Sequence, residues 1–109
     1  MNNRIEEILQ MRDQDPDDPF LWYALALEYV KSGDPIVAEK AFDAVLERFP
    51  EYLPAYYQAA VYFWDQGSFE KARHAFVQGI RLAEVSDDLK TLQELRNSYQ
   101  NFLIDLDEI

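Results

Sequence analysis

The side chains that could perform acid–base or nucleophilic chemistry are few and scattered. The only histidine, His74, lies between Arg73 and Ala75 in a predicted helix, and the chain has no cysteine to accompany it. The serines are expected at turns or on helix surfaces, at Ser32, Ser68, Ser86 and Ser98. No glycine-rich phosphate loop, histidine-pair metal motif or nucleophile elbow occurs. We therefore expect no catalytic residue and no cofactor, and the chain is predicted not to be an enzyme.

Carboxylates are abundant and gather in three places. The acidic clusters are Asp13, Asp15, Asp17 and Asp18, then Glu84, Asp87 and Asp88, then Asp105, Asp107 and Glu108. One interpretation is that they solvate turns and favour helix N-termini. The other is that they form a docking surface for a basic partner. A metal site made of carboxylates alone is a weaker alternative, and we expect no metal.

The overall charge narrows the classes of partner. Twenty-one acidic against ten basic residues give a formal charge of −11, which disfavours nucleic acid and anionic lipid. No stretch reaches the roughly 18 apolar residues that a transmembrane helix needs. The first residues also lack the continuous apolar run of a signal peptide. The composition predicts a soluble cytoplasmic protein with no membrane partner.

The elements that would position any site come from an internal repeat of 34 residues. Small or apolar residues and glycines recur at this interval, while charged positions vary. The identical pairs are Tyr23 and Tyr57, Ala26 and Ala60, Gly33 and Gly67, Ala38 and Ala72, Ala41 and Ala75, and Phe42 and Phe76. A repeated core with a variable surface is the simplest interpretation.

Each copy is predicted to form two helices joined by a glycine turn. In the first copy, Asp18 can cap a helix that begins with Pro19, and Gly33 can end it in a left-handed conformation. Asp34 and Pro35 repeat the same start signal for a second helix. The second copy starts at Pro54, breaks at Gly67, restarts after Ser68 and runs to about Ala83.

The flanks continue the scheme. The segment 3–13 is predicted to be the second helix of a truncated preceding repeat, because Ile8 lies 34 residues before Phe42. After Ser86, expected to be an N-cap, residues 87–107 are predicted to form one long closing helix. Its apolar residues have helical spacing, but it lacks the aromatic and alanine pattern of the repeat.

These positions carry a specific resemblance. The residues Trp22, Leu25, Ala26, Tyr29, Gly33, Ala38, Phe42 and Pro50 resemble the signature of the tetratricopeptide repeat, and the second copy is similar. The resemblance implies an all-α, right-handed solenoid of helical hairpins in a single domain, 1–109. It would contain the half-repeat helix 3–13, repeat one at 19–52, repeat two at 53–86, and the closing helix 87–107.

The resemblance also implies a non-catalytic scaffold whose concave groove binds a peptide or helix of another protein. The groove positions are Phe20, Tyr23, Leu27, Val30, Lys31, Tyr57, Val61 and Trp64. This lining is largely apolar and set in an acidic chain, so a basic or apolar partner segment is expected. The alternative is that the closing helix folds over part of the groove and makes Tyr57, Val61 and Trp64 core residues.

The closing helix carries a second signal. Leu92, Leu95, Tyr99, Phe102, Leu106 and Ile109 alternate at spacings of three and four, as in a heptad seam. Its last turns are expected to lie beyond what one repeat helix can cover, so they either fray or pack on another chain. The alternative function is therefore a structural protein that dimerises through Tyr99, Phe102, Leu103, Leu106 and Ile109.

Overall fold

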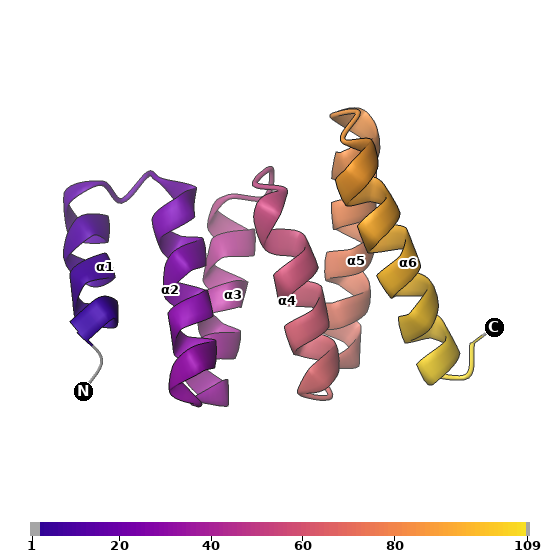
Figure 1. The fold of residues 1–109 in the computed structure, drawn as a ribbon, viewed down its shortest axis with the longest axis horizontal. Coiled ribbons are helices and arrows are strands. Elements are labelled where there is room, and N and C mark those ends of the chain that lie inside the picture. Colours follow the sequence, from indigo (N-terminus) through magenta and orange to yellow (C-terminus); the bar gives the residue numbers. More distant parts are fainter. Residues whose placement is uncertain (1–2, 109) are drawn as a thin grey trace. The chain divides into compact units, whose positions relative to one another are not determined.

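The computed structural model describes residues 3–108, and every regular element in that range is an α-helix. The helices are α1 (Asn3–Gln14), α2 (Pro19–Ser32), α3 (Pro35–Arg48), α4 (Pro54–Asp65), α5 (Phe69–Val85) and α6 (Leu89–Asp105) (Figure 1). The all-α prediction is therefore confirmed.

The contacts between Cα atoms divide the chain into two compact units, Met1–Ala55 and Tyr56–Ile109. Unit 1 holds α1, α2 and α3; unit 2 holds most of α4 together with α5 and α6. The single domain 1–109 and its repeat boundaries remain a prediction.

The helix boundaries of unit 1 follow the expected capping pattern. The Asp18 carboxylate accepts a hydrogen bond of 3.0 Å from the backbone N–H of Phe20, and Pro19 occupies the first turn. Gly33 ends α2 with a φ of 78°, where a side chain would be strained. Asp34 then caps α3 by accepting from the N–H of Val37 at 3.3 Å. Local chemistry therefore fixes the ends of the α2–α3 hairpin.

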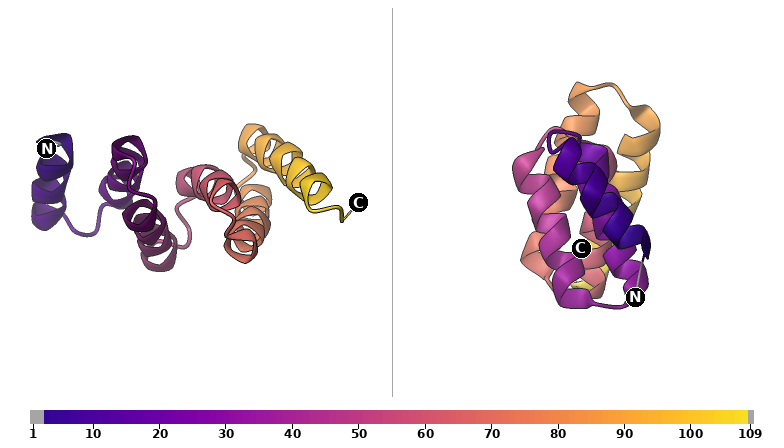
Figure 2. Two further views of the ribbon diagram at one scale, coloured as in Figure 1. Left: turned by 90° about the horizontal axis from the view of Figure 1, so that it is seen from below. Right: turned by 90° about the vertical axis from the view of Figure 1, so that its left-hand side faces the viewer.

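In unit 1, α2 and α3 pack as an antiparallel hairpin and α1 packs on α2 (Figure 1; the left view of Figure 2 shows α2 and α3 nearly end-on). Ala26 on α2 and Ala38 on α3 have no exposed surface. Small residues at these positions let two helix backbones approach closely. The buried apolar set comprises Ile8, Leu21, Leu25, Ala26, Ala38, Phe42, Val45 and Ala55.

In unit 2, α4 pairs with α5, and α6 packs on α5. The two helices α4 and α5 come close together at Gly79, where an added Cβ would lie 2.9 Å from the Cβ of Tyr56. This explains a glycine inside a helix, where it is otherwise unfavourable by about 1 kcal/mol. The core consists of Tyr56, Ala59, Ala60, Phe63, Ala72, Ala75, Phe76, Ala83, Leu92, Leu95 and Phe102.

The turn between α5 and α6 differs from the prediction. Ser86 is not the N-cap of the closing helix; it ends α5, and its hydroxyl donates to the carbonyl of Leu82 at 2.9 Å. Asp88 caps α6 instead, accepting from the backbone N–H of Thr91 at 3.1 Å and from its hydroxyl at 2.9 Å. Aspartate is as good an N-cap as serine, and here it satisfies two donors.

Candidate partner-binding surface

One side of α2 in unit 1 carries a row of apolar and aromatic side chains, here called the α2 stripe. Its members are Phe20, Tyr23, Leu27, Val30 and Lys31, spaced so that they share a helix face. Phe20 is 57% exposed and Val30 is 37% exposed, while Tyr23 and Leu27 are half-buried. The structure thus leaves the predicted unit 1 residues accessible along the length of the helix.

Tyr23 is held in place by the segment that follows α3. Its ring meets the ring of Tyr52 edge to face, with centroids 6.0 Å apart. Burial, and secondarily the neighbouring Tyr52, raise the pKa of Tyr23 above its ordinary value of 10.0. The phenol is therefore neutral near pH 7 and can donate a hydrogen bond from a largely apolar surface.

Lys31, at the end of the stripe, is engaged by a buried carboxylate that sequence reasoning missed. Its Nζ lies 3.3 Å from Glu28 Oε2, and Arg4 Nε of α1 lies 3.7 Å from the same oxygen. Glu28 is buried, and such a charge needs paired cations. The only signal in the sequence is an acid inside the apolar run of α2, and its partner Arg4 is remote.

In unit 2, the apolar positions 34 residues further on are exposed at the start of α4 and half-buried towards its end. Tyr57 is 36% exposed and Val61 is half-buried. Trp64 is not a free groove residue: its indole N–H donates to Asp105 Oδ2 at 2.7 Å. Its ring also meets that of Phe102 edge to face at 5.5 Å. The closing helix therefore engages Trp64, which is half-buried and not a core residue, and its role in a groove stays a prediction.

The self-association residues on α6 are also largely occupied within unit 2. Phe102 has no exposed surface, and its ring lies 5.4 Å from that of Phe76. The expectation that Phe102 is exposed was wrong, because α5 spans 17 residues and matches the 17 residues of α6. Three further residues, Tyr99, Leu103 and Leu106, are half-buried. Ile109 lies outside the described residues.

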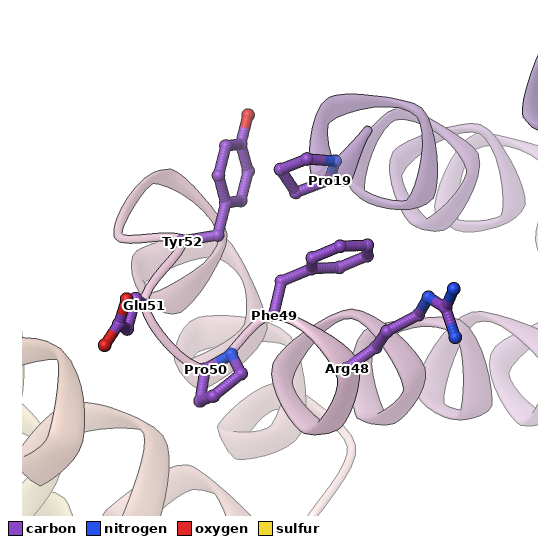
Figure 3. Close-up of a pocket in the computed structure, with 6 residues that line it drawn as sticks. All are labelled: Pro19, Arg48, Phe49, Pro50, Glu51 and Tyr52. Atoms are coloured by element: carbon purple, nitrogen blue, oxygen red, sulfur yellow. The ribbon is translucent and has the colours of Figure 1, made fainter. Parts of the chain in front are cut away.

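Unit 1 contains a pocket that the sequence analysis did not anticipate. It has a volume of about 390 Å³ and is lined by Pro19, Arg48, Phe49, Pro50, Glu51 and Tyr52 (Figure 3). We call it the Pro19–Tyr52 pocket. The signal that could have located it is the density of prolines and aromatic residues between α3 and α4. Through the Tyr52–Tyr23 contact, the pocket is continuous with the α2 stripe.

Arg48 lines this pocket but directs its guanidinium away from Tyr52 (Figure 3). Its Nη2 lies 3.2 Å from Asp17 Oδ1, and its Cζ lies 5.1 Å from the ring centre of Trp22. Arg12 of α1 stacks on the same ring at 4.6 Å, and the indole N–H donates to the carbonyl of Pro16 at 2.9 Å. Trp22 therefore joins α1, α2 and α3.

The tetratricopeptide repeat family model matches residues 23–87, which is more than half of the chain. The chain therefore belongs to the tetratricopeptide repeat family, and the resemblance inferred from its signature residues is confirmed. Repeats of this family generally mediate protein–protein interactions, as non-enzymatic scaffolds.

Solved structures support the assignment. A tetratricopeptide repeat domain protein from Salinibacter ruber, solved by NMR, is 31% identical with a TM-score of 0.74, covering 81% of this chain and 89% of that one. A crystal structure from the same organism gives 29% identity and a TM-score of 0.71, covering 78% and 94%. A protein from Bordetella parapertussis shares the fold at 23% identity and a TM-score of 0.76, covering 96% and 91%. No curated protein matches the chain.

Among the described residues, 3–108, no helix is long and apolar enough to cross a membrane. Within the same range, no group of three or more histidine, aspartate or glutamate side chains could hold a metal ion.

Proposed function

We propose that this protein is a non-catalytic interaction scaffold that binds a peptide or helical segment of another protein on the α2 stripe. The observation that carries the proposal is the exposed apolar surface between Phe20 and Val30 on one face of a helix. Ten residues of α-helix span about 15 Å, enough to contact about three turns of a partner helix.

The chemistry of the stripe suits such a partner. Aromatic residues that are partly exposed give a large contact area at low cost in conformational entropy. Tyr23 adds a neutral hydroxyl that can donate to a partner's carbonyl. The partner segment is expected to be apolar or basic, because the chain carries a formal charge of −11.

The corresponding face of α4 is the weaker candidate. At the 34-residue offset, Phe20 is replaced by Pro54 and Val30 by Trp64. Pro54 offers no aromatic surface, and Trp64 is held by Asp105. Tyr57 and Val61 remain accessible on that face, but it has no counterpart of the strongly exposed Phe20, so the proposal places the main contact in unit 1.

Dimerisation through α6 remains a prediction, and the burial of Phe102 removes its largest proposed contact. The apolar surface that is still accessible in the last turns consists of Leu103, Ile104 and Leu106, of which only Ile104 is largely exposed.

The test is affinity capture from native lysate with identification by mass spectrometry, comparing two matched variants. Tyr23→Glu with Leu27→Glu introduces two charges into the α2 stripe and should abolish capture of the specific partner. Tyr57→Glu with Val61→Glu introduces the same charges at the equivalent positions of α4 and should retain most of it. Both variants must keep the helical circular dichroism of the wild type. Undiminished capture by the first variant would reject the α2 stripe as the binding surface.

A further inference from the structure

The Pro19–Tyr52 pocket combines apolar walls with an acidic surrounding. The rings of Pro19, Phe49 and Pro50 contribute its apolar surface, and the ring of Tyr52 stands opposite Pro19 (Figure 3). Proline and aromatic rings form rigid surfaces on which an alkyl chain can pack. A pocket of about 390 Å³ can hold one long side chain.

The charge around the pocket is negative. Residues 12–19 and 48–52 together carry five carboxylates and two guanidiniums. Both guanidiniums lie over the Trp22 ring, and that of Arg48 is also paired with Asp17. On the other side, Asp18 directly precedes the lining residue Pro19, and its negative charge adds to burial in raising the pKa of the Tyr52 phenol. The Tyr52 end of the pocket therefore attracts a cation.

We propose that the Pro19–Tyr52 pocket receives a lysine or arginine side chain from a basic segment of the partner protein. The methylene stem would pack on Pro19 and Phe49, and the cationic head would lie at the Tyr52 ring and the Asp18 carboxylate. The aromatic face and the carboxylate would both attract the cation, so the two interactions both favour binding. This inference rests on the proposed function and names the chemistry of the partner.

The location of the pocket beside the α2 stripe also supports this proposal. Pro19 precedes Phe20, the first residue of the α2 stripe, and Tyr52 contacts Tyr23 within it. A segment that places apolar side chains along Phe20 to Val30 can therefore place a basic side chain in the pocket at one end. The expected partner is an apolar segment with a basic residue at its edge.

The probe is a fluorescein-labelled peptide of leucine, serine and glycine that carries two arginines, measured by fluorescence anisotropy against the full chain. A second peptide replaces both arginines with citrulline, which keeps the shape but removes the charge. We expect the arginine peptide to bind more tightly, and the Asp18→Asn and Tyr52→Ala variants each to weaken it about two- to five-fold. Neither variant should affect the citrulline peptide as strongly.

The control variant is Asp87→Asn in unit 2. It removes one carboxylate, as Asp18→Asn does, at a position whose φ of 58° suits asparagine. Asparagine also replaces aspartate well as an N-cap, so Asp18→Asn should fold normally. Equal weakening by Asp87→Asn and Asp18→Asn would overturn the proposal, because only the general charge would then matter. Equal binding of the two peptides, or no binding of the arginine peptide, would overturn it as well.

The two proposals fail separately. If Tyr23→Glu with Leu27→Glu abolishes partner capture while Asp18→Asn leaves arginine-peptide binding unchanged, the α2 stripe stands and the pocket assignment is wrong. If Asp18→Asn weakens the arginine peptide while the Tyr23 and Leu27 substitutions leave partner capture intact, the pocket binds a basic side chain but the α2 stripe is not the partner surface.

Discussion

Each unit uses a tryptophan to attach a flanking helix to its pair of repeat helices. The two tryptophans lie at different positions of the repeat. In unit 1, Trp22 attaches the preceding segment: its indole N–H donates to the Pro16 carbonyl, and Arg12 of α1 stacks on its ring. In unit 2, Trp64 attaches the following helix by donating to Asp105 of α6.

The difference coincides with a difference in exposure at the far end of each helix face. At the 34-residue offset, Trp22 corresponds to Tyr56 and Trp64 corresponds to Val30. Because Trp22 lies near the start of α2, attaching α1 leaves Val30 exposed at the far end. Because Trp64 lies near the end of α4, attaching α6 occupies that end of the face and leaves Tyr57 accessible. The two faces therefore differ at their last apolar position, which is exposed as Val30 in α2 and half-buried as Trp64 in α4.

The largest effect is expected at the aromatic cluster that holds α6. Phe102→Ala should reduce the free energy of unfolding by about 3–5 kcal/mol, since it deletes a fully buried ring. Urea titration followed by circular dichroism measures the loss, and Phe102→Leu provides a milder variant if alanine prevents folding. Ile104→Ala, at a neighbouring exposed site, should change stability by less than about 0.5 kcal/mol. Similar losses for both would mean that α6 is not packed as described.

The next effect concerns the close approach of α4 and α5. Gly79→Ala should destabilise by about 1–3 kcal/mol, because its Cβ would meet the Cβ of Tyr56, which is fixed to the α4 backbone. Helix propensity alone predicts the opposite sign, a gain of about 1 kcal/mol. Gln78→Ala is the neighbouring control, and thermal denaturation gives the sign. A raised melting temperature for Gly79→Ala would contradict the described contact.

A smaller effect is expected from the tryptophan hydrogen bond of unit 2. A double-mutant cycle of Trp64→Phe and Asp105→Ala should give a coupling energy of about 1 kcal/mol. In the matched cycle, Trp22→Phe is combined with Asp105→Ala and should show no coupling, because Trp22 donates to a backbone carbonyl. Independent effects of Trp64 and Asp105 would show that α6 is held by ring packing alone.

The smallest effect is a pH dependence in unit 2. Arg73 donates two hydrogen bonds to Glu108, at 3.0 and 2.7 Å, and lowers the pKa of that carboxyl from its ordinary 4.5. The resulting stability is present above the unfolded pKa of 4.5 and is lost as the pH falls through the lowered folded pKa. Glu108→Gln should therefore flatten the dependence of the melting temperature between pH 5 and about pH 2.

The control for this titration is Glu94→Gln, which removes a carboxylate from the exposed side of α6. It should leave the slope of melting temperature against pH close to that of the wild type. If Glu108→Gln also left the slope unchanged, the pairing with Arg73 would not contribute to stability.

Much of the fold could be predicted because its signals are local. Asp18, Gly33 and Asp34 determine helix ends through groups within three or four residues. The 34-residue repeat then identifies the pairs of small and large residues that bury one another. The prediction that Ser86 is the N-cap was wrong because Asp88, two residues later, is an equally suitable cap and directly precedes the first residue of α6.

The accessible surface could be predicted only in part, since it depends on contacts between distant segments. Trp64 and Asp105 are 41 residues apart, and nothing in either local pattern indicates their hydrogen bond. Arg48 and Asp17, 31 residues apart, form an ion pair beside the pocket residue Phe49 that neither local pattern indicates. The burial of Phe102 follows from the length of α5, which continues to Val85 beyond the repeat pattern.

The most direct test of the central claim is hydroxyl-radical footprinting of the chain with and without the partner identified by affinity capture. The oxidation rate of an aromatic side chain reports whether its helix face is covered. The reporters are Phe20 and Tyr23 for α2 and Tyr57 for α4. We predict that the partner slows oxidation of Phe20 and Tyr23 several-fold and leaves Tyr57 nearly unchanged. Protection of Tyr57 with Phe20 unaffected would contradict the account.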